Sequence, residues 1–226
     1  MKAMILAAGR GERMRSLTDL MPKPLLKVGG KPLIVWHLER LAQAGFKEII
    51  INHAYLGAQI EAALGCGAEW GVTIEYSPEK VALETAGGIA NALHLLGESA
   101  FLVVNGDTYS EISFSALKTA LPANNYAHLV LVNNPPQHPD GDFAMIEGML
   151  KNTGTPMLTF SGVGIYHPNL FANIIKGEPA KLAPLLRKAI DSRRATAEHY
   201  QGVWHDIGTP ERLYALDQQL LKFNKN

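Results

Sequence analysis

Apolar residues along the first half of the chain form short runs separated by stretches with helical spacing. Four apolar or alternating runs predict strands, at residues 3–6, 48–52, 72–76 and 101–104. Between these runs, helical spacing predicts helices over residues 33–45, 54–64 and 89–96. Strands and helices that alternate in this way form βαβ units, so this half predicts a mostly parallel sheet. Ligands of such sheets bind beyond the carboxyl ends of the strands.

The pattern is less regular from residue 113 onward. Further strands are predicted at residues 128–132, 143–146 and 158–166, and further helices at residues 113–121, 181–194 and 210–220. Residues 133–142 contain three prolines and one glycine, which predicts a loop. We therefore expect an α/β fold in which helices cover both faces of a mostly parallel central sheet and a small β-rich lid follows. The length suits a single domain over residues 1–226.

Composition and charge argue against several classes of protein. Lys+Arg and Asp+Glu both number 21, and the resulting net charge of zero argues against a nucleic-acid-binding protein, which usually carries a basic excess. Cys66 is the single cysteine, so neither a disulfide framework nor a cysteine-based metal site is expected. No apolar run approaches a membrane span, and Arg10, Glu12 and Arg13 end the first run too early for a secretion signal. We expect a cytoplasmic protein without nucleic-acid or membrane partners, and the sequence does not indicate an oligomeric state.

The first predicted strand leads into a stretch suited to binding a polyphosphate. Residues 7–11 read Ala-Ala-Gly-Arg-Gly, and such small residues let the backbone approach another group closely. Arg13 follows, and Lys23 stands between two prolines whose fixed backbone presents the ammonium group from a stiff segment. Backbone N–H groups and these cations can together share the charge of a polyphosphate.

Two better-known phosphate-binding loops are excluded. The dinucleotide-binding pattern G-x-G-x-x-G requires a third glycine where this chain has Met14, and the Walker A pattern does not occur. Gly9 and Gly11 taken alone are equally compatible with an ordinary tight turn. The interpretation as a phosphate site therefore depends on the whole stretch from residue 6 to residue 26.

Two later segments carry polar residues at the edge where a ligand would bind. Residues 83–88 read LETAGG at the start of a predicted helix, where Glu84 and Thr85 would contact a ligand or merely cap the helix. Asp107 follows the buried run 101–104, where it would hold a ligand or form an Asx-turn or a helix cap. The residues alone leave both alternatives open.

The stretch from Leu6 to Leu26 closely resembles the signature of the sugar-1-phosphate nucleotidyltransferases, L-A-A/G-G-x-G-x-R-[L/M]-x-x-L-T-x-x-x-P-K-P-L-[L/V]. This chain fills every fixed position of that pattern. Three later segments are also similar to motifs of the family, at residues 83–88, 105–107 and 203–210. The resemblance covers nearly the whole chain and implies a three-layer, Rossmann-like fold of the nucleotide-diphospho-sugar transferase type.

The resemblance also implies a role for each motif. The arginine that matches Arg13 stabilises the departing pyrophosphate and the lysine that matches Lys23 contacts the reacting phosphates, so both would be catalytic. The aspartates that match Asp107 and Asp206 hold Mg²⁺ in the family. Residues 1–132 would form the nucleotide-binding half, and residues 133–226 would form the sugar-binding half and lid. The nucleotide would contact Leu6, Ala7, Ala8, Gly9, Gly11, Glu84, Thr85, Gly87 and Asn105.

The sugar side is less clearly marked. Many longer members of the family carry an E-K-P motif whose lysine meets the sugar phosphate, and this chain has no such motif. Lys181 is the candidate replacement, although a solvated surface lysine fits this position equally well. Asp142 and Gly162 are the other candidate sugar-binding residues.

Among the compact members, the motifs look most like those of the N-acetylmuramate 1-phosphate uridylyltransferases. The resemblance then implies UTP and N-acetylmuramate 1-phosphate as substrates, Mg²⁺ as the cofactor, and UDP-N-acetylmuramate and pyrophosphate as products. Two alternatives stay open: a mannose- or glucose-1-phosphate nucleotidyltransferase using GTP or dTTP, and a regulatory subunit that binds a nucleotide sugar without catalysis. The presence of Arg13, Lys23, Asp107 and Asp206 argues against the second, because a binding module would not need all of these residues.

Overall fold

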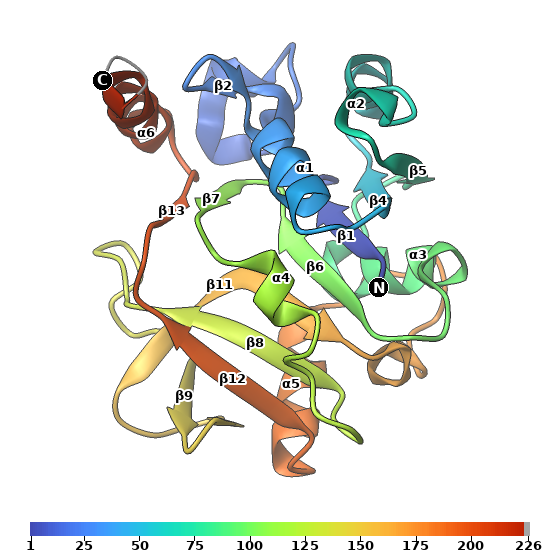
Figure 1. The fold of residues 1–226 in the computed structure, drawn as a ribbon, viewed down its shortest axis with the longest axis vertical. Helices are drawn as coiled ribbons and strands as arrows, with labels where there is room; N and C mark the ends of the chain where they lie inside the picture. Colours follow the sequence, from blue (N-terminus) through green and yellow to red (C-terminus); the bar gives the residue numbers. More distant parts are fainter. Residues whose placement is uncertain (224–226) are drawn as a thin grey trace.

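A nine-stranded sheet runs through the computed structural model of the protein, which describes residues 1–223 (Figure 1). Residues 224–226 of the predicted domain lie outside the described residues. The strand order is β5-β4-β1-β6-β11-β8-β12-β10-β9. The first four strands are those predicted for the N-terminal half, β5 (Thr73–Pro78), β4 (Glu48–His53), β1 (Ala3–Leu6) and β6 (Phe101–Asn105). They pair in parallel, which confirms the prediction from the βαβ pattern.

The register of β1 with both of its neighbours places three strand ends at one level. Leu6 pairs with Asn52 of β4 on one side and with Asn105 of β6 on the other. The segments that follow these residues therefore emerge at the same edge of the sheet, where α/β proteins bind their ligands. The glycine loop follows Leu6 and Asp107 follows Asn105, so both predicted motifs lie at this edge.

Helices cover both faces of this sheet, as Figure 1 shows. They are α1 (Leu33–Gln43), α2 (Gly57–Leu64) and α4 (Phe114–Leu117) on one face, and α3 (Glu84–Leu96) and α5 (Leu182–Asp191) on the other. Successive residues of a strand point to opposite faces, so Met4 of β1 joins the buried cluster under α3 and Ile5 joins the cluster under α1. This arrangement confirms the three-layer α/β fold.

The later strands extend the same sheet with both parallel and antiparallel pairings. They are β8 (Ala127–Val132), β9 (Phe143–Ile146), β10 (Met149–Lys151), β11 (Met157–Tyr166) and β12 (Ala195–Tyr200). β11 is antiparallel to β6 and to β8, and β12 is parallel to β8. Because β9 pairs with both β10 and β11, these five strands close a ring of pairings. This ring is the β-rich part of the fold.

The sequence did not predict β12 and misplaced two helix boundaries. Ala195 and Ala197 point into the core and alternate with less buried residues, but alanine has little strand propensity, so the alternation gives a weak signal. α4 is shorter than the expected helix at residues 113–121, and α3 begins at Glu84 rather than at Ile89. The earlier start of α3 matters for function, because it places Glu84 in the first turn of a helix.

The C-terminal segment returns to the N-terminal half of the fold. β13 (Trp204–Asp206) pairs antiparallel with β7 (Thr108–Ser110), and Asp206 lies opposite Thr108. α6 (Pro210–Phe223) follows and lies beside β2 (Lys27–Val28), where Leu216 packs in a buried cluster with Val28 (Figure 1). The motif at residues 203–210 is thereby brought next to Asp107.

Short elements complete the described part of the chain. β3 (Lys31–Pro32) forms a hairpin with β2, and the 3₁₀ helices are η1 (Glu12–Thr18), η2 (Lys23–Leu25), η3 (Ala68–Trp70) and η4 (Pro168–Phe171). Within residues 1–223, no helix has the length and apolar character needed to cross a membrane.

His37 of α1 is a buried histidine that supports the start of β7. Its Nε2 lies 2.7 Å from the carbonyl oxygen of Thr108, to which it donates a hydrogen bond. Nδ1 has no hydrogen-bond partner within the described residues. Burial lowers the pKa of His37 from 6.5 to about 4, because an imidazolium would lose its hydration, and the Arg40 guanidinium acts in the same direction. His37 is therefore neutral in the folded protein at neutral pH.

We expect acid to destabilise the fold through His37. The unfolded chain binds a proton at this residue below pH 6.5 and the folded protein only below about pH 4, so the free energy of unfolding falls as the pH drops through this window. A shift of this size corresponds to about 3 kcal/mol. Chemical denaturation across the window should show a shallower fall for His37→Gln than for His94→Gln, a control at an exposed histidine. Equal slopes for the two variants would contradict this assignment.

Candidate active site

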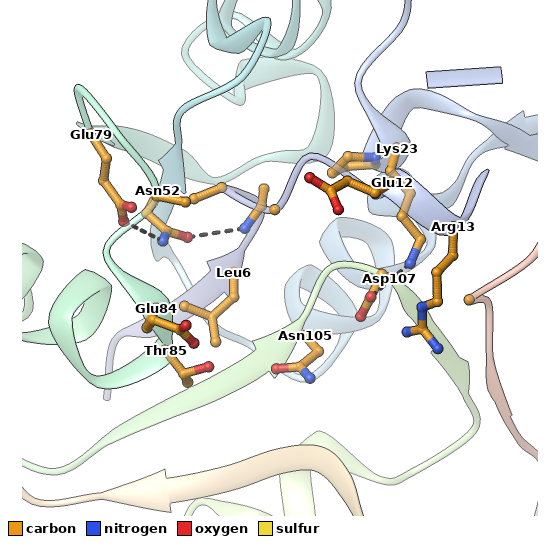
Figure 2. A pocket seen from close by; sticks show the side chains of 17 residues that line it. Leu6, Glu12, Arg13, Lys23, Asn52, Glu79, Glu84, Thr85, Asn105 and Asp107 are labelled. Carbon is orange, nitrogen blue, oxygen red and sulfur yellow. Dashed lines mark hydrogen bonds and ion pairs between the residues drawn. The ribbon is translucent and has the colours of Figure 1, made fainter. Parts of the chain in front are cut away.

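A cavity of about 770 Å³ lies at the carboxyl ends of the parallel strands (Figure 2). It is lined by the glycine loop, the segment after β6 and the start of α3. Figure 2 shows two groups of side chains separated by Leu6 and Asn105: Glu12, Arg13, Lys23 and Asp107 on one side, and Asn52, Glu79, Glu84 and Thr85 on the other. One end of the cavity therefore carries cations beside a carboxylate, and the other end carries hydrogen-bonding groups.

The glycine loop contains one glycine that the fold requires and one that it does not. Gly11 has a φ of 70°, and a Cβ on it would lie 3.1 Å from Cδ of Lys23, so both its backbone and its surroundings favour glycine. A Cβ on Gly9 would meet no atom within 4 Å. Gly9 therefore leaves backbone open to the cavity, which suits close approach of a phosphate. Leu6, Ala7 and Ala8 line the same cavity.

Lys23 is held rigidly and points toward Asp107. It begins η2 after Pro22, whose backbone is extended, and its side chain is only 7% exposed because it packs against Gly11. Its Nζ donates to Oδ2 of Asp107 at 2.7 Å. The prediction that two prolines brace this lysine agrees with the geometry, and the ammonium group is presented to the cavity with little freedom to move.

Asp107 makes an ion pair with Lys23, and its carboxylate is 40% exposed on the cavity side. The turn after β6 is closed by Oγ1 of Thr108, which donates to the carbonyl oxygen of Asn105. Arg13 lines the same end of the cavity from η1, and its Cζ would lie 3.3 Å from a Cβ on Gly208. Two cations, Arg13 and Lys23, thus lie with the carboxylates of Asp107 and Glu12 at this end of the cavity (Figure 2).

The start of α3 forms the opposite end of the cavity. Glu84 has a φ of 59°, a left-handed backbone that costs about 1–3 kcal/mol in a residue other than glycine. Leu83 occupies the N-cap position and makes no side-chain cap hydrogen bond, so neither Glu84 nor Thr85 is the N-cap residue that the capping alternative required. Glu84 and Thr85 line the cavity instead.

Asn52 and Glu79 are cavity residues that the sequence reasoning missed. Oδ1 of Asn52 accepts from the backbone N–H of Ala7 at 3.0 Å, and Nδ2 donates to Oε1 of Glu79 at 2.7 Å. Oε2 of Glu79 accepts from the backbone N–H of Leu83 at 2.8 Å. Burial raises the pKa of Glu79, because the carboxylate loses hydration. Asn52 lies near the end of β4 and Glu79 directly follows β5. This position at the carboxyl end of a parallel strand is the sequence signal that could have identified both as cavity residues.

Asp206 lies near Asp107 in the backbone but faces another space. The backbone N–H of Ile207 donates to the carbonyl oxygen of Asp107 at 3.1 Å. Oδ2 of Asp206 accepts from Nη1 of Arg212 at 2.5 Å, and both residues line a second cleft of about 410 Å³ between residues 133–137 and α6. The two predicted metal ligands therefore lie on segments joined by a backbone hydrogen bond, and their carboxylates pair with different cations.

The donor set nevertheless fits Mg²⁺. Within residues 1–223 no group of three or more His, Cys, Asp or Glu side chains is arranged to hold a metal ion. Mg²⁺ commonly uses only one or two protein carboxylates and completes its shell with water and substrate phosphates. Asp107 and Asp206, which are partly exposed and lie on segments joined by a backbone hydrogen bond, could supply these two carboxylates.

The predicted sugar-binding residues are not brought together by the cavity. Gly162, with a φ of 81°, packs against the side chain of Asn105, which does line the cavity. Asp142 instead accepts from the backbone N–H of Phe160, and Lys181 is the exposed N-cap residue of α5. Gly87, predicted to contact the nucleotide, is packed against the backbone of residues 178–180. These four residues stay predictions.

Known proteins resemble this chain over nearly its whole length. The family model described as "Nucleotidyl transferase" matches residues 2–222. An N-acetylmuramate alpha-1-phosphate uridylyltransferase from Neisseria meningitidis serogroup B is 58% identical over 94% of this chain and 95% of its own length. A protein of the same name from Caulobacter vibrioides is 34% identical over 96% of each chain.

A solved structure has the same fold. HddC from Yersinia pseudotuberculosis, complexed with GMP-PN, superposes with a TM-score of 0.78 over 96% of this chain and 98% of its own, at 22% identity. At that identity the likeness shows the fold alone. The family assignment depends instead on the family model, which matches almost all of the chain, and on the two relatives. The chain belongs to the nucleotidyl transferase family.

Proposed function

We propose that this protein transfers the uridylyl group of UTP to N-acetylmuramate 1-phosphate, giving UDP-N-acetylmuramate and pyrophosphate. The observation that carries the proposal is the 58% identity, over nearly the full length of both chains, to a protein named for that activity. The cavity supports it, because the phosphate-loop residues, Lys23 and Asp107 line one continuous space. We place the reaction in the cytoplasm, in the recycling of peptidoglycan sugars.

The nucleotide would span the cavity from end to end. Its triphosphate would lie along Gly9 and Gly11, where the backbone is open, with Arg13 and Lys23 beside it. Its base and ribose would lie toward Glu84 and Thr85 at the start of α3. This orientation matches the charge of the cavity, since the cations gather at one end and the uncharged base meets hydrogen-bonding groups at the other.

Neutralising charge is the main chemical task of such a site. An oxygen of the sugar 1-phosphate is already anionic and attacks the α-phosphate of UTP without a general base, and pyrophosphate leaves on the opposite side. Two anions must approach each other, so fixed positive charge and positioning dominate the catalysis. Arg13 would stabilise the departing pyrophosphate, and Lys23 would stabilise the reacting phosphates.

Asp107 and Asp206 would hold the Mg²⁺ ion. When bound, Mg²⁺ would supply divalent positive charge that offsets the repulsion of the nucleotide and acceptor phosphates. The acceptor sugar would lie against Asn105, which lines the cavity between its two ends, and against Gly162, which packs on the Asn105 side chain.

Pyrophosphate release should be measured with UTP, dTTP, GTP and CTP against several sugar 1-phosphates, with Mg²⁺ and with excess EDTA. We expect release with UTP and N-acetylmuramate 1-phosphate only, abolished by EDTA. Release with another pair would keep the mechanism and refute the assigned substrates. UTP binding without release from any pair would instead support a non-catalytic nucleotide-binding protein.

Lys23→Ala should lower turnover about a hundredfold or more, because a fixed donor facing transition-state charge contributes about 3–4 kcal/mol. The fold should persist, since Asp107, the partner left without its cation, is 40% exposed. Lys27→Ala removes an exposed lysine from the adjacent strand β2 and serves as the matched control, with near-normal turnover expected. Steady-state kinetics on both variants would make the test, and comparable turnover in the two would rule out the role given to Lys23.

A further inference from the structure

Asn52 and Glu79 connect the glycine loop to the start of α3 through a continuous chain of hydrogen bonds. The chain runs from the backbone N–H of Ala7 to Asn52, from Asn52 to Glu79, and from Glu79 to the backbone N–H of Leu83. Ala7 belongs to the glycine loop, and Leu83 directly precedes Glu84. Figure 2 shows the first two of these interactions as dashed lines on the side of the cavity opposite Lys23.

The direction of each hydrogen bond is fixed by the two backbone groups at its ends. A backbone N–H can only donate, so Asn52 must present its oxygen to Ala7 and its NH₂ group to Glu79. Glu79 then faces two donors, the amide of Asn52 and the N–H of Leu83, and must accept with both oxygens. An ionised carboxylate accepts both bonds with no proton of its own competing for either oxygen.

The pair has little freedom to move. Asn52 is 3% exposed and Glu79 is 7% exposed. A Cβ on Gly88 of α3 would lie 2.7 Å from Oε1 of Glu79 and 2.8 Å from Nδ2 of Asn52, so the helix packs directly on the junction. The donors of all three hydrogen bonds are neutral groups, and burying a carboxylate among neutral groups is costly. The Glu79 carboxylate is buried at a cost in free energy and is held tightly at the cavity wall, which indicates a role beyond packing.

We propose that Asn52 and Glu79 are positioning residues that fix the separation of the glycine loop from the start of α3. A nucleotide that spans the cavity meets both segments at once, so their spacing sets whether the triphosphate and the base can be bound together. Small displacements of binding groups have large effects on reactivity, about a hundredfold for 1 Å. This inference rests on the proposed function only in placing a nucleotide in the cavity.

Two single substitutions break the chain of hydrogen bonds. Glu79→Gln leaves one accepting oxygen for two donors, and Asn52→Asp sets a second carboxylate against Glu79. The double substitution Asn52→Asp with Glu79→Gln reverses the polarity of the central hydrogen bond. The new aspartate accepts from Ala7 and from the amide at position 79, and the oxygen of that amide accepts from Leu83. The double variant therefore restores all three bonds with unchanged net charge and nearly unchanged shape.

The experiment measures UTP affinity by calorimetry and steady-state kinetics for the parent, both single variants and the double variant. We expect each single substitution to weaken UTP binding about tenfold or more, because a buried group loses its partner. The double variant should return to within about threefold of the parent. KM for the sugar 1-phosphate should change little in all variants, whereas a general loss of folding would affect both substrates.

Controls separate positioning from structure and from direct contact. Asn91→Asp adds a carboxylate on α3 at a partly exposed residue that does not line the cavity, and its UTP affinity should equal that of the parent. Unfolding midpoints for every variant establish that binding is measured on folded protein. Normal UTP affinity in both single variants would overturn the proposal. A double variant no better than the weaker single variant would also overturn it, by indicating that the carboxylate of Glu79 contacts the nucleotide itself.

The outcome for the parent protein distinguishes this inference from the proposed function. If the parent binds GTP or dTTP in preference to UTP, the assigned substrate is wrong, and the same variants then test the hydrogen-bond chain with the preferred nucleotide. If the parent binds UTP and the variants behave as the parent does, the positioning role is wrong and the proposed function stands.

Discussion

The register of β1 between β4 and β6 is the constraint on which the site depends. Because Leu6 is level with both Asn52 and Asn105, the glycine loop, Asn52 and Asp107 emerge at one edge. A slip by one residue would turn every side chain of β1 to the other face and exchange the partners of the two buried clusters. The core thus fixes the register, and the register fixes the geometry of the cavity.

The ion pair between Lys23 and Asp107 links this scaffold to chemistry. Its two members come from segments 84 residues apart, and the sheet brings them within 2.7 Å of each other. Such a half-buried pair contributes modestly to stability, since the desolvation cost offsets most of the attraction. The ion pair matters more for function, because it holds a cation and a carboxylate in place beside the open backbone of Gly9. Little reorganisation of these groups is then needed when the substrate binds.

Local sequence signals predicted those parts of the site that depend on local structure. The strand–loop signal at Gly9 and Gly11, the proline-braced Lys23 and the acidic residue after β6 could all be read from short windows, and the structure places them in one cavity. The family resemblance located Asp206, but no local pattern indicates that Arg212 draws its carboxylate toward a second cleft.

The features that escaped prediction depend on tertiary contacts. β12 is built around two buried alanines whose strand signal is weak without the neighbouring β8. Asn52 lies near the end of β4 and Glu79 directly follows β5, and their hydrogen bond depends on the pairing of these two strands, which no local pattern shows. Lys181 and Asp142 were chosen by residue type and position, neither lines the cavity, and their sugar-binding role stays a prediction.

A crystal structure of the protein with UTP and Mg²⁺, without the acceptor sugar, would test the central claim most directly. The account predicts a triphosphate along Gly9 and Gly11 beside Arg13 and Lys23, a metal ion on Asp107, and the base at Thr85. A nucleotide bound in the cleft between residues 133–137 and α6, with the Lys23–Asp107 cavity empty, would contradict it.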